Sequence, residues 1–188
     1  MIIGISGKIG AGKDTLAECI QEIDPDFQNK KFAYKLKQIA TILTGVDDQW
    51  THEGKECYLN NWGMTIREVQ QRLGTDAMRV GLHPDVWILA LFADWEPHKY
   101  LKWVVTDVRF PNEAQAILDR GGFIVRIDGT RRPQDKPASL HPSEVSLDRY
   151  VFDYRFDNTH LTMDELRAHA ATILEIVGNE QRRLYTYC

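Results

Sequence analysis

Residues 2–17 of the chain read IIGISGKIGAGKDTLA. The apolar run 2–6 is typical of a buried strand, and Leu16, Ile20 and Ile23 recur at the spacing of one helix face. Between the strand and the helix lies the pattern G-x-x-x-x-G-K, from Gly7 to Lys13. A strand, a glycine-rich turn and a helix in this order predict a loop that wraps around phosphate groups.

The spacing of this loop follows from the chemistry of a polyphosphate. Glycines let the backbone bend so that successive N–H groups point at one anion, and the N-terminus of the next helix adds its positive end. The ammonium group of Lys13 supplies charge for the β- and γ-phosphates. We therefore expect nucleotide phosphates to be bound by Gly7, Lys8, Gly10, Ala11, Gly12, Lys13, Asp14 and Thr15.

The residue after Lys13 departs from the usual motif. Ser or Thr commonly stands there and binds Mg²⁺ through its hydroxyl, whereas this chain has Asp14. A carboxylate beside a triphosphate would be repelled unless a cation lay between them, so we expect Asp14 to bind Mg²⁺ directly or through water. Thr15 can then donate to the α-phosphate.

A second acidic residue follows a later strand. Residues 102–106 (KWVVT) are apolar on both faces, as in a strand buried in a parallel sheet, and Asp107 comes next. A carboxylate at this place commonly faces the metal ion, although Asp at a strand end is also a frequent turn former. In an extended chain Arg109 lies on the same side as Asp107. It then either holds a substrate phosphate or pairs with Asp107 or Glu113.

Strand and helix patterns alternate along the chain. Strands are expected at 2–6, 31–33, 102–106, 123–127 and 150–156, and helices at 16–23, 36–43, 65–73, 84–95, 111–120 and 162–177. We expect Gly45, Gly74 and Gly178 to end helices, and Pro84 and Pro111 to begin helices. Thr65 and Glu68 match a capping box at the start of another helix. The alternation predicts an α/β fold with a mostly parallel sheet of about five strands.

The helical part between the second and third strands is too long for one crossover connection. We therefore expect one domain with a core at 1–33 and 101–188 and a helical insertion at 34–100, in which residues 46–63 show no clean period. A proline-rich loop at 128–146 contains Arg131, Arg132 and His141. This loop is either a solvated basic turn or a lid whose arginines close over the phosphates as charge spreads in the transition state.

Composition limits the classes of function. The chain has 188 residues, 43% hydrophobic residues and a formal net charge of −4, which disfavours a protein that mainly binds nucleic acid or an anionic membrane. Its cysteines, Cys19, Cys57 and Cys188, form no CxxC pair, and the six histidines no HExxH motif. These patterns indicate a reducing, cytoplasmic setting without a zinc site. We expect neither a signal peptide nor a membrane span.

Three segments together resemble the deoxynucleoside monophosphate kinases of bacteriophages. They are GISGKIGAGKDTLA at 4–17, QRLGTDAMR at 71–79, and VVTDVRFPNEAQAI at 104–117 followed by GGFIVRI. HPSE at 141–144 and Asn158 before the last helix also fit. The resemblance spans nearly the whole chain and implies a three-layer P-loop kinase fold with a helical monophosphate-binding insertion and a lid. It further implies transfer of the γ-phosphate of ATP to a deoxynucleoside monophosphate, with Mg²⁺.

The same resemblance implies roles for particular residues. The loop 7–15 would hold the phosphates of ATP, and Asp107 and Arg109 would lie between the two nucleotides. The catalytic residues would be Lys13, Asp107, Arg109, Arg131 and Arg132, and the metal ligands Asp14 and Asp107. The residues that bind the monophosphate would be Phe32, Lys37, Arg72, Thr75, Asp76, Trp87, Arg109, Glu113 and His141.

Other functions stay open on the residues alone. A monophosphate oxygen is already anionic at neutral pH and needs no strong base, whereas a kinase for an alcohol, such as a nucleoside or coenzyme precursor, needs a carboxylate base. Asp76, Asp107 or Glu113 could supply it. A GTP-dependent switch is disfavoured because no DxxG follows the third strand and no NKxD occurs. A non-catalytic nucleotide-binding module and a homodimer also stay open, and the accepted bases are not determined.

Overall fold

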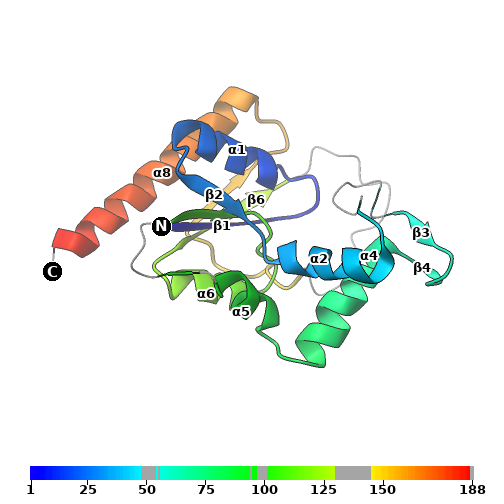
Figure 1. The fold of residues 1–188 in the computed structure, drawn as a ribbon. Helices are drawn as coiled ribbons and strands as arrows, with labels where there is room; N and C mark the ends of the chain where they lie inside the picture. Colours follow the sequence, from blue (N-terminus) through cyan, green and yellow to red (C-terminus); the bar gives the residue numbers. More distant parts are fainter. Residues whose placement is uncertain (48–53, 55, 94, 97–100, 130–144, 187–188) are drawn as a thin grey trace. The chain divides into compact units, whose positions relative to one another are not determined.

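The computed structural model describes residues 1–47, 54, 56–93, 95–96, 101–129 and 145–186 (Figure 1). The chain forms two compact units. Unit 1 comprises Met1–Lys30 and Glu96–Cys188, and unit 2 comprises Lys31–Trp95. Within the described ranges, no helix has both the length and the apolar character that crossing a bilayer requires.

Unit 1 is built on a parallel sheet. Its helices are α1 (Lys13–Ile23), α6 (Pro111–Leu118) and α8 (Met163–Thr186), and its strands are β1 (Ile2–Gly7), β2 (Phe27–Lys30), β5 (Lys102–Val105), β6 (Phe123–Asp128) and β7 (Tyr154–Asp157). The strand order is β2-β5-β1-β6-β7, and every neighbouring pair is parallel. The predicted α/β fold with a mostly parallel sheet of about five strands is confirmed.

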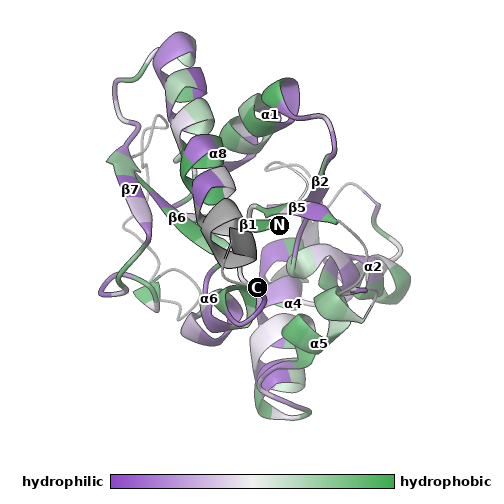
Figure 2. Ribbon diagram, turned by 90° about the vertical axis from the view of Figure 1, so that its left-hand side faces the viewer, coloured by the Kyte–Doolittle hydropathy of each residue, from purple (hydrophilic) through white to green (hydrophobic). Residues whose placement is uncertain are grey.

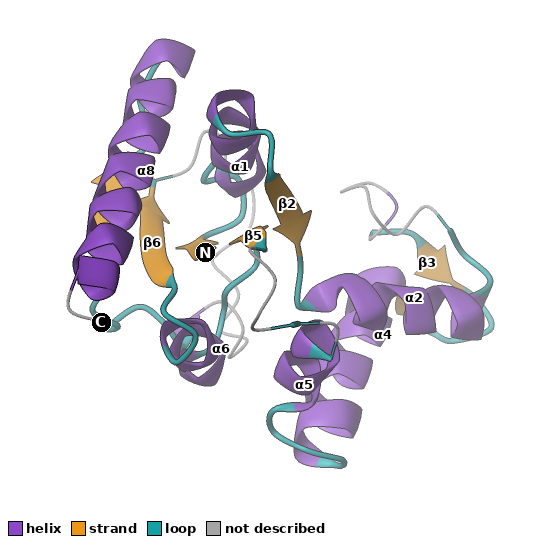
Figure 3. Cartoon of the chain, turned by 60° about the vertical axis from the view of Figure 1, so that its left-hand side comes forward, coloured by secondary structure: helices purple, strands orange, loops and turns teal. Residues whose placement is uncertain are grey.

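Helices cover both faces of this sheet (Figure 3). On one face, Ile3 and Ile5 of β1 belong to a buried core together with residues of α1 and α8. On the other face, Gly4 lies against α6, because a Cβ atom at Gly4 would be 2.8 Å from Cδ1 of Ile117. Figure 2 shows β6 as a mainly hydrophobic strand and α8 as a helix of mixed character, as expected of a central strand and a covering helix. The unit therefore has three layers.

The crossover connections of unit 1 mark where a ligand is expected. From β1 the chain passes through α1 to β2, at one end of the strand order, whereas from β6 it continues to β7, at the opposite end. The adjacent strands β1 and β6 thus flank a point at which the direction of the connections reverses. In open parallel sheets, ligands bind at the carboxyl ends of the strands at such a point. The glycine-rich loop at 7–13 follows the carboxyl end of β1.

Unit 2 is mainly helical. It contains α2 (Ala33–Thr44), the short hairpin of β3 (Tyr58–Leu59) and β4 (Met64–Thr65), α4 (Ile66–Gln71), the π-helix η1 (Arg72–Val80) and α5 (Val86–Phe92). Helix α2 packs against α4, η1 and α5. The rings of Phe32 and Phe92 meet edge to face, with their centroids 6.3 Å apart.

Several predicted strands lie at different residues. The strand expected at 31–33 is β2 at Phe27–Lys30, and the last strand, expected at 150–156, is Tyr154–Asp157. The sequence misplaced β2 because it is an edge strand in which only Phe27 is buried and the neighbours Gln28 and Asn29 are polar. The hairpin β3–β4 begins inside the stretch 46–63, for which the sequence predicted no regular structure.

Helix ends were predicted with mixed success. The capping box at Thr65 and Glu68, the end of α2 at Gly45 and the start of α6 at Pro111 are confirmed. The predicted ends at Gly74 and Gly178 are wrong, because α4 continues directly into η1 and α8 runs on to Thr186. Pro84 does not begin α5, which starts at Val86. A Cβ atom at Gly74 would lie 2.9 Å from Cδ2 of Leu36 in α2, so this glycine allows close packing rather than ending a helix.

Candidate functional site

The phosphate loop, residues 7–13, has the sharp bends that its glycines allow. Gly10 and Gly12 have φ of 79° and 94°, a region that residues with a side chain rarely adopt. The N–H group of Ala11 donates to the carbonyl oxygen of Lys8 at 3.2 Å and closes a turn. Helix α1 begins at Lys13, immediately after the second bend. The loop therefore curves around the N-terminus of α1, where a helix favours an anion.

Asn158, which directly follows β7, holds this loop in place. Its side-chain amide is buried and donates to the carbonyl oxygen of Ala11 at 2.8 Å. A Cβ atom at Gly12 would lie only 2.5 Å from the same amide nitrogen, so this contact requires glycine at position 12. The sequence offered Asn158 only as part of the family resemblance, without a structural role.

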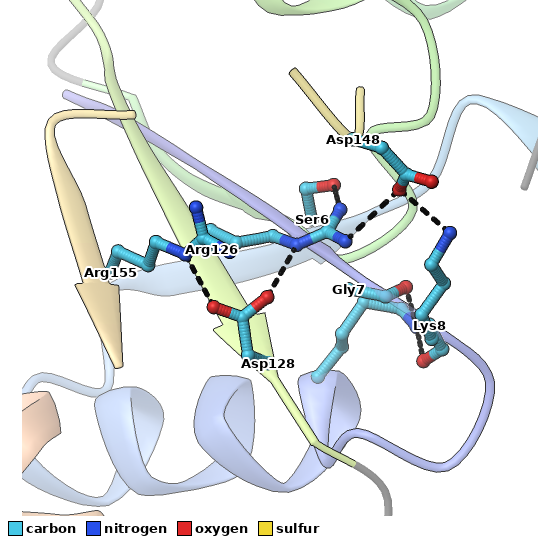
Figure 4. Close-up of polar contacts among 8 residues, drawn as sticks. Ser6, Gly7, Lys8, Arg126, Asp128, Asp148 and Arg155 are labelled. Atoms are coloured by element: carbon cyan, nitrogen blue, oxygen red, sulfur yellow. Dashed lines mark hydrogen bonds and ion pairs between the residues drawn. The ribbon is translucent and has the colours of Figure 1, made fainter. Parts of the chain in front are cut away.

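Two lysines of the loop donate to oxygen atoms of unit 1. The ammonium group of Lys13 donates to the carbonyl oxygens of Gly7 and Lys8, each at 2.8 Å. The ammonium group of Lys8 donates to Oδ1 of Asp148 at 2.7 Å (Figure 4). Both cations thus lie along the loop that the sequence predicted to hold phosphates.

Asp14 lies next to the carboxyl end of β5. The buried hydroxyl of Thr106 donates to Oδ1 of Asp14 at 2.9 Å, joining residues 92 positions apart, and half-buried Asp107 follows Thr106. Oxygen atoms of this kind suit Mg²⁺. In the part of the chain that the structure describes, no three His, Cys, Asp or Glu residues gather into a metal site. A metal ion at Asp14 and Asp107 would therefore take its remaining ligands from phosphate and water, as Mg²⁺ commonly does.

Glu113 and Arg109 are joined through the backbone. Glu113 is buried, and its carboxylate accepts from the N–H groups of Arg109 at 2.7 Å and of Phe110 at 3.0 Å, at the start of α6. This use of the carboxylate was missed, because the sequence suggested a substrate contact or a pair with the Arg109 side chain. Strand β5 ends at Val105 and residues 106–107 form a turn, so Asp107 and Arg109 follow the strand rather than belonging to it.

A buried arginine of β6 lies beside the end of β1, where the loop begins (Figure 4). Arg126 of β6 is 7% exposed and donates to Ser6 Oγ at 3.2 Å, to Asp128 Oδ1 at 3.2 Å and to Asp148 Oδ1 at 3.5 Å. Arg155 donates to the other oxygen of Asp128. Sequence reasoning missed this cluster, although an arginine inside the apolar strand FIVRID was the available signal.

The two arginines keep Asp128 ionised. Burial by itself would raise the pKa of this carboxyl group, but the hydrogen bonds from Arg155 and Arg126 outweigh burial and hold the pKa below its ordinary value of 3.8. Asp128 therefore carries a negative charge throughout the neutral range and shares Arg126 with Asp148.

The candidate residues of unit 2 fall into two groups. Phe32 and Trp87 are buried, and Nε1 of Trp87 donates to the carbonyl oxygen of Gly74 at 2.9 Å. Arg72 and Asp76 of η1 are exposed, whereas Thr75 of η1 and Lys37 of α2 are half-buried. The first pair builds the interior of unit 2, and the second group offers polar side chains at its surface. The predicted lid residues Arg131, Arg132 and His141 lie outside the described residues.

Comparison with known proteins identifies the family. No family model matches the chain. The chain is 36% identical over 166 residues to a protein of Acanthamoeba polyphaga mimivirus named "Putative deoxynucleotide monophosphate kinase", and the match covers 78% of this chain and 82% of that protein.

Two solved structures share the fold. A gluconokinase from Sinorhizobium meliloti 1021 matches with a TM-score of 0.51 and 13% identity over 99% of this chain and 96% of its own. A shikimate kinase from Aquifex aeolicus matches with a TM-score of 0.50 and 14% identity over 96% and 98%. These structures support the three-layer P-loop kinase fold, and the mimivirus protein gives the family. This chain is a phosphotransferase that belongs to the family of deoxynucleotide monophosphate kinases.

Proposed function

We propose that this chain transfers the γ-phosphate of ATP to a deoxynucleoside monophosphate and forms a deoxynucleoside diphosphate and ADP. The observation that carries the proposal is the contact between Asp14 and Thr106, which brings the phosphate loop and the end of β5 together. The 36% identity to a relative whose name specifies a deoxynucleotide monophosphate substrate supports the choice of acceptor.

The donor would be held by the phosphate loop. Backbone N–H groups of residues 7–13 and the N-terminus of α1 would bind the phosphates of ATP. Lys13 would exchange its carbonyl acceptors for oxygens of the β- and γ-phosphates, which hold an ammonium group more strongly because they are charged. Asp14 and Asp107 would hold Mg²⁺, which neutralises phosphate charge when it is bound.

The acceptor needs alignment rather than activation. An oxygen of its phosphate, already anionic at neutral pH, attacks the γ-phosphorus, and the bond from that phosphorus to the leaving ADP oxygen breaks. Arg109, Arg131 and Arg132 would neutralise the charge that spreads in the transition state. Arg72, Thr75 and Asp76 would contact the monophosphate substrate, together with Lys37 and His141.

A coupled assay with ATP tests the proposal. The panel contains the common ribo- and deoxyribonucleoside monophosphates, the matching nucleosides and a dephosphorylated coenzyme precursor. We expect deoxynucleoside monophosphates to be phosphorylated and Lys13→Ala to lower kcat/KM by about 100-fold or more. Lys102→Ala is the matched control, since Lys102 stands at the opposite end of β5 and bonds Asp24 and Asp26 at the surface.

Two results would contradict the proposal. Phosphorylation of nucleosides or coenzyme precursors without any monophosphate would assign the chain to kinases that act on alcohols. Activity of Lys13→Ala close to that of the unmodified chain would show that the loop is not the donor site.

A further inference from the structure

The two lysines of the phosphate loop are held by different kinds of acceptor. Lys13 donates to carbonyl oxygens, which are neutral, whereas Lys8 donates to the carboxylate of Asp148 (Figure 4). Both kinds of contact are charge-assisted because the ammonium group is ionised, but a carboxylate carries a full negative charge and therefore attracts that group more strongly than a carbonyl dipole does. A phosphate that reaches the loop therefore replaces weak acceptors at Lys13 but must compete with another anion at Lys8.

The position of Asp148 is fixed from two further directions. Arg126 donates to the same carboxylate oxygen that Lys8 contacts, Oδ1, at 3.5 Å. The N–H group of Asp148 donates to the carbonyl oxygen of Val145 at 3.0 Å, within a turn anchored by the buried side chain of Leu147. Asp148 therefore stays beside the loop when Lys8 turns toward another anion.

Arg126 compensates the charge of Asp148 only in part. Its guanidinium group is shared with Asp128 and with the hydroxyl of Ser6. Once Lys8 turns to a phosphate, Arg126 is the cation that stays in contact with Asp148 among the described residues, and Arg126 also contacts the carboxylate of Asp128. A negative charge then remains close to the bound phosphates and repels them.

We propose that Asp148 is a positioning residue that competes with the phosphates of ATP and ADP for Lys8 and thereby weakens the binding of both nucleotides. This inference rests on the proposed ATP site. Weaker binding of ADP favours its release, and product release limits the turnover of many enzymes.

Calorimetric titration with ATP and with ADP tests this role, using Asp148→Asn on the full chain. The amide retains the shape of the side chain and removes its charge. We expect the Kd for both nucleotides to fall by about two- to five-fold at low salt, the range of a partly exposed ion pair, and the difference to shrink as salt screens the charge. Asp119→Asn is the matched control, because it makes the same change of net charge at the exposed C-terminal end of α6, before β6 begins at Phe123.

A double-mutant comparison isolates the competition. If Asp148 acts through Lys8, Asp148→Asn has a much smaller effect on the Kd in a Lys8→Met background. Asp148→Glu, which keeps the charge, should bind ATP like the unmodified chain. Should Asp148→Asn unfold below the assay temperature, Asp148→Ser removes the charge in its place.

The outcomes separate this inference from the proposed function. Equal or weaker nucleotide binding by Asp148→Asn would overturn the competition and leave the ATP site intact. Failure of the unmodified chain to bind ATP would overturn both.

Discussion

Gly12 is the residue at which backbone conformation and close packing both restrict the phosphate loop. Its φ of 94° disfavours any side chain, and a Cβ atom would lie 2.5 Å from the amide nitrogen of Asn158. We therefore expect Gly12→Ala to lower the free energy of unfolding by about 2 kcal/mol, and to weaken ATP binding because the amide of Asn158 loses its place against Ala11. Urea unfolding and a titration with ATP measure the two effects.

A second glycine provides the control for this substitution. A Cβ atom at Gly178, inside α8, would meet no atom within 4 Å. Gly178→Ala should therefore raise the free energy of unfolding, by up to about 1 kcal/mol, because alanine favours a helix. Similar losses of stability at both positions would refute the argument from the loop.

Single residues differ in how well the sequence predicts their place. The bends at Gly10 and Gly12 were predictable because they follow from the local spacing of glycines. The contacts of Lys8, Ser6 and Ala11 with Asp148, Arg126 and Asn158 join residues 140, 120 and 147 positions apart. No local pattern records such a pairing, so these three contacts became visible only in the folded chain.

Helices and strands show the same division between local and distant causes. Thr65 with Glu68, and Pro111, predicted helix starts correctly because caps depend on the residues beside them. Gly74 led to a wrong prediction of a helix end, because the reason for a glycine there is the close approach of Leu36 from another helix. The position of the polar edge strand β2 was predicted wrongly, because pairing with β5 stabilises this strand and its own sequence carries no strand pattern.

The π-helix η1 is held from outside by Trp87 of α5. The buried indole N–H donates to the carbonyl oxygen of Gly74, a backbone group of η1. Trp87→Phe keeps an aromatic ring there but removes this donor and part of the buried ring, so we expect a loss of about 2 kcal/mol or more from the free energy of unfolding. Hydrogen exchange should locate the loss, with faster exchange of the η1 amides.

Trp62→Phe is the matched control for Trp87→Phe, because it makes the same substitution at an exposed position between β3 and β4. Trp62 is 40% exposed, so we expect its replacement to change the free energy of unfolding by less than about 0.5 kcal/mol. Equal effects of the two substitutions would show that neither the burial of Trp87 nor its hydrogen bond to Gly74 decides the result.

The whole molecule combines a net charge of −4 with a group of cations at one functional edge. Lys8, Arg126 and Arg155 lie there in contact with the carboxylates of Asp128 and Asp148. An acidic chain can therefore still attract a polyanion to such a place, because the gathered cations act on it at short range, where salt screens them least. Composition predicted the acidic background, but the fold was needed to reveal which cations gather.

Two groups with a lowered pKa, His169 and Asp128, should each reduce the stability of the whole molecule as the pH falls. Burial lowers the pKa of His169, although Glu165 acts in the opposite direction, and Asp128 has a lowered pKa because of Arg155 and Arg126. A lowered pKa in the folded state means that the unfolded chain binds the proton more readily. The contribution of His169 is thus complete above about pH 6.5, the ordinary value for histidine, and decreases below it. That of Asp128 decreases only below about pH 4.

Replacing one group at a time separates the two contributions in urea unfolding measured from pH 8 to pH 3. His169→Gln should flatten the dependence of the free energy of unfolding on pH between about pH 7 and pH 5. The variant lacks the titrating imidazole ring, which stacks on the ring of Phe156 with the two centroids 4.1 Å apart. Asp128→Asn should lower stability at neutral pH by about 2 kcal/mol, since it leaves Arg126 buried with less compensation, and should flatten the curve below pH 4. Asp119→Asn, at an exposed helix end, should leave both contributions unchanged. An acid limb that is identical in Asp128→Asn and the unmodified chain would show that the bonds from Arg126 and Arg155 do not control the ionisation of Asp128.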